Sequence, residues 1–383
     1  LDRRAGGVLQ QRYRCAACTH WFVVAIAAKD SAAPAVEKKS LRDELEQYLL
    51  GRSDLPPVPE RIKATRIEDM GFDTPQEAVA LFSDYHYGSK IDKRAASGLA
   101  EYNMDIARAR LTKWRDGLLR FTQSDQVLLE IDTLHLFALG DDFEGHGRMF
   151  QSQGLQMETS LGFQVVDFVE DMSRVLLEFL TRYKKVKVYK VRGNHGRIAN
   201  SAKEDYPPDS AELFAWQMIA ERLTGQLGGT KRISDTGIRC YEGGPIEFYI
   251  SPGFILFTEI LGWTFAMRHG HGIKGIDSTY TGALSNKLRM NAIVGEVINY
   301  YVKAHLHEPQ SAESEIQGRV IQNGCLVGPS LLSVEMSRAA ANLPSQEMWL
   351  MHPKHGITNM HRITLAEVGD VRQLEWIGRT EPR

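Results

Sequence analysis

The sequence is poor in cysteine, in net charge and in long apolar runs, and each shortage excludes a class of protein. Only 4 of its 383 residues are cysteine, too few and too scattered for a disulfide framework. A formal net charge of −2 gives no overall positive field to attract nucleic acid, so any contact with DNA must be local. No stretch approaches the ~20 apolar residues that span a bilayer. The sequence therefore predicts a protein of the reducing cytoplasm that makes no membrane contact.

The first 75 residues differ in composition from the rest. They hold the CxxC pair Cys15 and Cys18, an Ala/Pro segment and three prolines between residues 56 and 59. We expect residues 1–75 to form an extension with a Pro-rich linker, and residues 76–383 to form the main domain. Cys15 and Cys18 look like half of a zinc ribbon, which needs further ligands from His20 or a partner chain. Inert cysteines are the alternative, and Cys240 and Cys325 are expected to be buried.

From about residue 76, short apolar strands alternate with amphipathic helices, which is typical of an α/β fold. Strands are expected at 78–83, 134–139 and 186–191, and helices at 98–121, 164–183 and 212–223. After residue 241 the pattern favours further strands at 247–250, 254–259, 264–268, 320–322 and 363–365. The basic stretch 182–192 is interpreted as a strand whose polar face is solvated, in preference to a nucleic-acid contact.

Polar clusters follow several of these strands. Because ligands of α/β sheets bind at the carboxyl ends of strands, clusters far apart in sequence can converge there. On an extended segment, two side chains two residues apart point to the same side, so each D-x-H or H-x-H pair can meet one site. Six of the twelve histidines lie in the five clusters, which are Asp84-Tyr85-His86, Gly140-Asp141-Asp142, Gly193-Asn194-His195, His269-Gly270-His271 and His305-Leu306-His307.

The side chains of these clusters are imidazole, carboxylate and carboxamide, with no thiolate. That set suits Mn²⁺, Fe or Zn²⁺ in a catalytic site better than a structural zinc site. Two ions ~3.5–4 Å apart can hold the attacking and leaving oxygens of an in-line displacement at phosphorus. A carboxylate must lie between two dications that close, because they repel each other strongly. Asp141, directly after the flexible Gly140, suits that position.

The order D-x-H, G-D, G-N-H, H-G-H, H-x-H resembles the calcineurin-like metallophosphoesterase superfamily over about residues 78–310. The resemblance implies a four-layered α/β/β/α sandwich with two mixed sheets, and a catalytic domain at 76–383. It also implies two divalent metal ions, with Mn²⁺ favoured and Fe, Zn²⁺, Mg²⁺ or Ni²⁺ as alternatives. The first ion would be held by Asp84, His86 and His307, and the second by Asn194, His269 and His305, with Asp141 bridging them.

The resemblance further implies a catalytic role for Asp141 and for His195, which would protonate the leaving group or steady the transition state. His271 is then a neighbour, although it could exchange with His269 as ligand. Asp142 and Glu144 are expected to support ligands or face solvent. Two departures from the family pattern matter. Gly196 stands where the family has the Asp that orients the histidine, and Ala304 stands where it has Gly.

Within the superfamily, the segment 140–144 (GDDFE) is similar to SbcD-like DNA-repair nucleases. The segments 193–197 (GNHGR) and 270–275 (GHGIKG) are similar to phage-encoded exonucleases of this class. The resemblance implies a nuclease that hydrolyses phosphodiester bonds of DNA in the cytoplasm of a bacterium or a phage-infected host. The alternatives are a phosphomonoesterase or nucleotide phosphodiesterase, and a binding scaffold that has lost catalysis. A homo-oligomer is compatible with the sequence. Four basic residues are candidates for substrate contacts: Arg148, Arg197, Arg268 and Lys274.

Overall fold

The computed structural model describes residues 4–5, 8–14, 21–26, 57, 60, 75–147, 152–199, 203–271, 280–313, 318–335 and 343–366. The chain divides into two compact units, Leu1–Gly51 and Arg52–Arg383. In the first unit, β1 (Arg4–Ala5), β2 (Val8–Arg14) and β3 (Trp21–Ile26) form an antiparallel sheet in that order. Cys15 and Cys18 lie outside the described residues, and the boundary at residue 75 stays a prediction.

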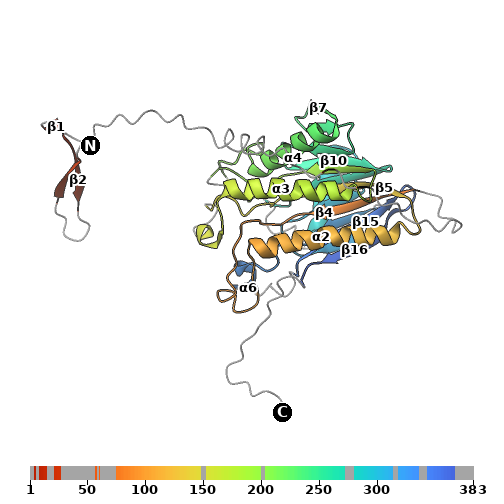
Figure 1. The fold of residues 1–383 in the computed structure, drawn as a ribbon, viewed down its shortest axis with the longest axis horizontal. Coiled ribbons are helices and arrows are strands. Elements are labelled where there is room, and N and C mark those ends of the chain that lie inside the picture. Colours follow the sequence, from red (N-terminus) through yellow and green to blue (C-terminus); the bar gives the residue numbers. More distant parts are fainter. Residues whose placement is uncertain are drawn as a thin grey trace, which may run out of the picture. The chain divides into compact units, whose positions relative to one another are not determined.

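The larger unit contains an eight-stranded mixed sheet whose centre is parallel (Figure 1). Four parallel strands follow one another across it, each feeding a loop at the same edge. They are β4 (Gln76–Phe82), β5 (Ile131–Ala138), β6 (Lys185–Lys190) and β9 (Ile246–Ile250). Antiparallel strands complete both sides: β15 (Ser345–His352) and β16 (Gly356–Thr364) beyond β4, and β8 (Arg239–Glu242) and β7 (Thr230–Ile233) beyond β9.

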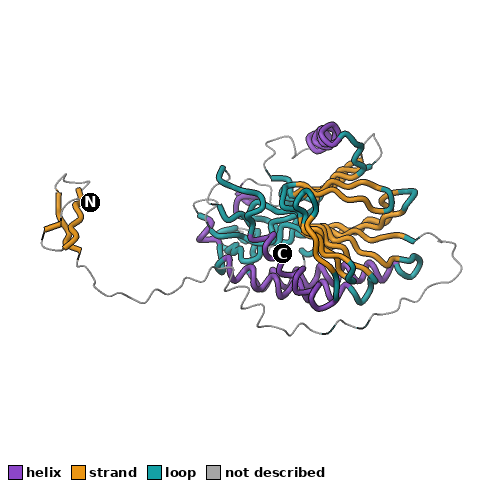
Figure 2. The backbone as a smooth tube through the Cα atoms, turned by 90° about the horizontal axis from the view of Figure 1, so that it is seen from above, coloured by secondary structure: helices purple, strands orange, loops and turns teal. Residues whose placement is uncertain are grey.

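A second, five-stranded mixed sheet has the order β10-β11-β12-β14-β13. Its three middle strands are parallel: β11 (Trp263–Arg268), β12 (Tyr300–Lys303) and β14 (Arg319–Gln322). The outer strands β10 (Ile255–Ile260) and β13 (Gln310–Glu313) run antiparallel to their neighbours. The two sheets stack face to face (Figure 2), so alternate side chains of their strands meet in a shared apolar layer.

That layer is the main core of the unit. Val79, Leu81 and Phe137 of the larger sheet pack in one cluster with Phe265 and Val302 of the smaller sheet. The Phe137 and Phe265 rings meet edge to face, with their centroids 5.5 Å apart. Side chains of alternate positions, such as Phe82, point to the other face of the larger sheet and meet the helices there.

Helices cover the outer faces and complete four layers. Three helices cover the larger sheet: α2 (Met104–Asp125), α3 (Leu161–Phe179) and α4 (Ala211–Leu227). The ring of Phe82 packs on that of Trp114 of α2, with their centroids 5.0 Å apart. On the smaller sheet, Met290 of α5 (Tyr280–Val294) packs on Ala266, Tyr301 and Val320. Two short helices, η1 (Gln153–Gln156) and α6 (Leu331–Glu335), lie in loops. This confirms the predicted α/β/β/α sandwich with two mixed sheets.

No helix within the described residues is long and apolar enough to cross a bilayer.

Candidate metal centre

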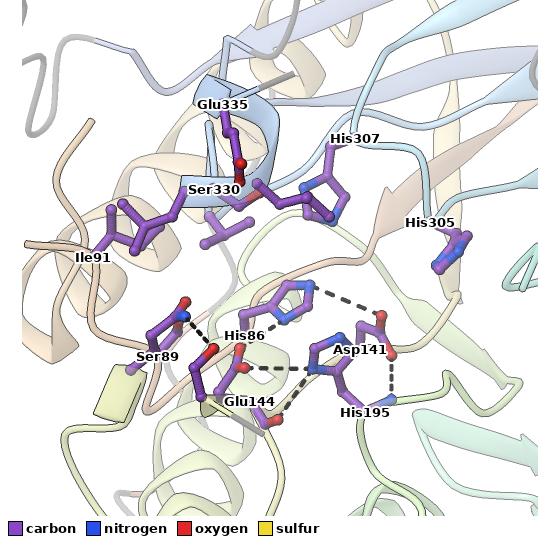
Figure 3. Close-up of a pocket in the computed structure, with 15 residues that line it drawn as sticks. His86, Ser89, Ile91, Asp141, Glu144, His195, His305, His307, Ser330 and Glu335 are labelled. Atoms are coloured by element: carbon purple, nitrogen blue, oxygen red, sulfur yellow. Dashed lines mark hydrogen bonds and ion pairs between the residues drawn. The ribbon is translucent and has the colours of Figure 1, made fainter. Parts of the chain in front are cut away.

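The five polar clusters follow five parallel strands of the two sheets. Asp84 and His86 come after β4, Asp141 after β5, and Asn194 and His195 after β6. From the smaller sheet, the loop after β11 supplies His269, and the loop after β12 supplies His305 and His307. The carboxyl ends of these strands meet at one edge of the sandwich, so the clusters converge there as the sequence predicts (Figure 3).

The loops that carry these side chains are strained. Seven non-glycine residues of the described chain have a positive φ. Five of them are in the centre: Asp84 (φ 53°), His86 (φ 47°), Asp141 (φ 56°), His305 (φ 79°) and His307 (φ 62°). Left-handed backbone costs a non-glycine residue about 1–3 kcal/mol and clusters at functional sites. The surrounding fold therefore holds these side chains inward against a local cost.

Three groups of side chains have the composition and spacing of metal sites, and one of them, His86, Glu144 and His195, shares His86 with the first group. In the first, ligand atoms of Asp84, His86 and His307 all lie within 4.8 Å of one another. Nε2 of His307 is 3.3 Å from Oδ1 of Asp84, whose side chain is fully buried. These are the residues that the sequence predicted for the first ion.

The second group is Asp141, His269 and His305, again within 4.8 Å. Nε2 of His269 lies 2.9 Å from Oδ2 of Asp141 and 3.1 Å from Nδ1 of His305. The same Oδ2 lies 3.8 Å from Nε2 of His86 in the first group. Asp141 therefore stands between the two groups, which is the position that a bridging carboxylate requires.

Unpartnered buried atoms test whether metal ions fit these groups. Nε2 of His86 and Oδ1 of Asn194 are buried and have no hydrogen-bond partner. Leaving a buried polar atom unpaired costs about 1–3 kcal/mol, so such atoms call for an explanation. Both are lone-pair donors to Mn²⁺, Fe or Zn²⁺, and one lies on each of the loops after β4 and β6. The donor set fits divalent metal ions.

Burial and neighbouring charges shift the pKa values of the carboxylates and imidazoles of the centre. Burial alone would raise the pKa of the Asp84 carboxyl, but the hydrogen-bonded His307 outweighs it and lowers that pKa to about 2. Burial would lower the pKa of His269, yet the Asp141 carboxylate raises it to about 9. Burial and the positive His269 lower the pKa of His305 to about 4, which keeps its lone pair free. Because a metal ion competes with the proton on His269, metal binding is expected to release that proton.

His195 lies beside the two groups and faces the pocket (Figure 3). Its Nδ1 is 3.1 Å from the backbone oxygen of Glu144 and 3.7 Å from the Glu144 carboxylate. Its backbone N–H donates to Oδ1 of Asp141 at 2.9 Å, and the N–H of Asn194 donates to the same oxygen at 2.8 Å. Oδ1 of Asp141 thus fixes the loop after β6, while Oδ2 faces the ligand groups.

A buried ion network behind the centre was missed by sequence reasoning. Nζ of Lys190 donates to Asp142 at 2.5 Å and to Glu212 at 3.0 Å, and all three side chains are fully buried. Glu212 also accepts the backbone N–H of Asp141 at 3.0 Å and of Gly193 at 2.9 Å. The network therefore holds two of the metal-site loops in register.

One expectation for this region needs correction. The stretch 182–192 was expected to present a solvated polar face, but Lys190 and Arg192 are fully buried in ion pairs. Asp142 and Glu144, which were expected to support ligands or face solvent, are both buried and hydrogen-bonded. A strand pattern identifies which positions share a face, but it does not reveal the carboxylates that a distant helix or loop brings to that face.

Two of the four predicted substrate contacts, Arg197 and Arg268, lie in the described part of the chain, and neither belongs to a ligand group. Arg268 donates to the backbone oxygen of His271 at 3.1 Å, and Arg197 is half-buried. Arg148 and Lys274 lie outside the described residues. His271 lies next to His269, with ring centroids 5.5 Å apart, but it belongs to neither ligand group. The geometry favours His269 over His271 as a ligand.

A pocket of about 550 Å³ opens over the centre. Its floor is formed by four residues of the two groups, His86, Asp141, His305 and His307, with Glu144 and His195 (Figure 3). Its walls come from the loop after β4, from η1 and from α6, and they mix hydroxyl, amide and apolar groups with one carboxylate. The described wall residues are Ser89, Ile91, Ser152, Gln156, Val327, Ser330, Leu331, Leu332 and Glu335.

No family model matches the sequence, and no curated protein matches it. Among solved structures, the chain is similar to vacuolar protein sorting 29 from Cryptosporidium parvum, at 13% identity and a TM-score of 0.33, over 76% of this chain and 100% of that one. It is similar to a 5′-nucleotidase from Candida albicans at 8% identity and a TM-score of 0.33, over 82% and 55%. A predicted phosphoesterase from Streptococcus pneumoniae gives 12% identity and a TM-score of 0.27, over 76% and 98%. The chemistry of the centre is therefore assigned from its own residues.

Proposed function

We propose that this chain is a metal-dependent phosphoesterase that hydrolyses phosphodiester bonds. The observation that carries the proposal is the position of Asp141 between two three-residue ligand groups, at the floor of a pocket. Asp84, His86 and His307 would hold one divalent cation, and His269, His305 and Asn194 the other, with Asp141 between them. When bound, the cations would polarise the phosphoryl group and lower the pKa of an attacking water.

The chain's own residues would orient the ester substrate and transfer a proton to its leaving oxygen. The pocket admits an ester next to His195, whose Nδ1 is tied to Glu144, so its Nε2 is free to face the substrate. Protonated His195 can then donate a proton to the leaving oxygen as the ester bond breaks. The apolar and hydroxyl walls above the centre exclude bulk water from the ester.

We further propose that the substrate is nucleic acid. This proposal is supported by the GDDFE and GNHGR segments, which carry Asp141, Asn194 and His195 in the centre. One observation favours a second candidate, a phosphomonoesterase or nucleotide phosphodiesterase acting on small esters. Among the described residues that line the pocket there is no lysine or arginine, and Glu335 adds a negative charge. Phosphate backbones are bound mainly through such cations.

A substrate panel with matched variants tests these assignments. The full chain, freed of metal and then supplied with Mn²⁺, is assayed on single- and double-stranded DNA, a bis-aryl phosphodiester, an aryl phosphomonoester and mononucleotides. We expect phosphodiester and DNA cleavage that His195→Ala reduces at least 100-fold, since one proton-transfer group contributes about 10²–10⁴-fold. Asp141→Asn should abolish cleavage, because it removes the negative charge between the two cations. The exposed His355→Ala is the control and should keep full activity.

The outcomes separate the candidates. Cleavage of small esters alone would favour the second candidate over a nuclease. Metal binding without hydrolysis of any ester would favour a binding scaffold and refute the proposed function.

A further inference from the structure

Glu144 contacts two imidazoles of the pocket: that of His86, which belongs to the first ligand group, and that of His195, the proposed proton donor. It lies three residues after Asp141, and only 5% of its surface is exposed. Its Oε2 is 3.1 Å from Nδ1 of His86. Its backbone oxygen is 3.1 Å from Nδ1 of His195, and its Oε1 is 3.7 Å from the same nitrogen. One residue thus reaches two histidines on two different loops.

These contacts fix the tautomer of each ring. A backbone carbonyl and an ionised carboxylate can only accept hydrogen bonds. In the neutral rings, Nδ1 of His86 and Nδ1 of His195 therefore carry the protons, which leaves Nε2 of His86 with a lone pair for a metal ion and makes Nε2 of His195 the atom that takes up the proton for the leaving group. Nε2 of His86 has no hydrogen-bond partner and points toward Asp141 at 3.8 Å. Glu144 therefore turns the metal-binding nitrogen of His86 toward the ligand group.

Glu144 is itself held in place. The fully buried Gln153 of η1 donates from Nε2 to the backbone oxygen of Glu144 at 2.7 Å and to its Oε1 at 3.0 Å. The rings of His86 and His195 meet edge to face, with their centroids 4.4 Å apart. Gln153, Glu144 and the two rings form one connected unit (Figure 3 shows its contacts to both histidines).

The glycine at 196 explains why this support comes from another loop. In the family pattern an Asp follows G-N-H and orients the histidine, but this chain has Gly196. A Cβ at 196 would lie 2.8 Å from Oε1 and 2.9 Å from Cδ of Glu212. The space for a side chain there is already filled, so His195 has to be oriented from elsewhere.

We propose that Glu144 is the positioning residue for both His86 and His195, and that it takes the place of the missing Asp at 196. The inference rests on the proposed function for the role of His195, but its effect on the two rings does not depend on any activity. Carboxylate partners of ligand histidines typically contribute 10- to 100-fold to metal affinity or activity.

The test compares Glu144→Ala and Glu144→Gln with the exposed Glu259→Gln as control, all in the full chain. Long-range ¹H–¹⁵N spectra of the histidines in metal-free protein report the tautomers of His86 and His195. Calorimetric titration with Mn²⁺ reports affinity. Turnover of two phosphodiesters, one with a p-nitrophenyl and one with a phenyl leaving group, reports proton donation.

In Glu144→Ala, we expect His86 to lose its Nδ1–H tautomer and Mn²⁺ to bind about 10- to 100-fold more weakly. His195 loses the nearby carboxylate but keeps the backbone oxygen of residue 144 as the acceptor for its Nδ1. Turnover should fall more for the phenyl ester, because a poor leaving group depends more on a proton from His195. Glu144→Gln keeps an acceptor for His86 and should restore Mn²⁺ affinity to within about threefold of wild type, since a neutral acceptor retains most of the hydrogen bond. Glu259→Gln should change nothing.

An unchanged His86 tautomer and Mn²⁺ affinity in Glu144→Ala would overturn the inference, as would an equal loss for both esters. If Glu144→Ala fails to fold, the same readouts on Glu144→Gln decide, because there the loss should be confined to the phenyl ester. If wild type hydrolyses no ester but the His86 tautomer and Mn²⁺ affinity still change as expected, the proposed function fails and the positioning of His86 stands.

Discussion

Replacing Lys190 with Met should destabilise the protein strongly, although the two side chains have similar length and volume. Lys190 is fully buried, and its ammonium contacts Asp142 at 2.5 Å and Glu212 at 3.0 Å. Methionine fills the same space, so little cavity is expected. The variant leaves two buried carboxylates without their cation. Removing one partner of a buried ion pair costs about 3–5 kcal/mol.

The loss should depend on pH. Burial raises the pKa of the Asp142 carboxyl, and Glu212 raises it further, to about 7 even with Lys190 present. A carboxyl whose pKa is raised in the folded state stabilises the fold below its unfolded pKa of 3.8 and loses that contribution as pH rises through the folded value. Without Lys190 the folded pKa rises further, so the deficit of the variant should be smaller at pH 5 than at pH 8.

Urea denaturation of metal-free protein at pH 5 and pH 8 measures both effects. Lys185→Met is the matched control, since Lys185 is on the same strand but a third exposed, and its pair with Glu247 should contribute at most about 1 kcal/mol. A loss below about 1 kcal/mol for Lys190→Met at pH 8, or a loss equal at both pH values, would refute the reasoning.

Three further predictions concern the centre. Gly196→Asp should lower the melting temperature and weaken Mn²⁺ binding, because its Cβ would displace Glu212. Gly225→Asp, where a Cβ meets nothing within 4 Å, is the control for calorimetry. His269→Ala should abolish binding of one Mn²⁺ equivalent while His271→Ala keeps both, as counted by titration; the reverse result would make His271 the ligand. Mn²⁺ at about 100 times its Kd should stabilise wild type by about 2.7 kcal/mol per site, and Asp84→Asn should lose most of that gain at the first site in a thermal shift assay.

Sequence periodicity predicted the strands that matter most for the centre. The apolar runs at 78–83, 134–139 and 186–191 correspond to β4, β5 and β6 within a few residues. β4 and β5 are largely buried, so apolar residues dominate them and are easy to recognise, whereas β6 alternates lysine with apolar residues. The polar residues directly after them were predicted to converge, and the structure brings them together. Cys240 and Cys325 are buried as expected.

Less apolar elements were missed or displaced. β7 (Thr230–Ile233) is exposed along its whole length, and α5 (Tyr280–Val294) shows little amphipathic pattern, so neither has a clear signal in the sequence. The helix expected from Gly98 begins at Met104, because Asn103 caps it by accepting the N–H of Ile106 at 2.8 Å.

The supporting residues of the centre could not be predicted from local pattern. Glu144 meets His86 across 58 positions of sequence, and Glu212 meets Asp141 across 71. Both contacts depend on how the loops and α4 are placed by the whole fold.

The division of the ligands between the two sheets has a mechanical consequence. Each group takes side chains from both sheets: Asp84 and His86 with His307 in one, and Asp141 with His269 and His305 in the other. Nδ1 of His269, which follows the smaller sheet, also donates to the backbone oxygen of Leu139, which follows the larger sheet, at 2.8 Å. Each bound cation would therefore cross-link the two sheets through its ligands. Loosening the apolar layer between the sheets, even far from the pocket, should release the cations before the strands themselves come apart.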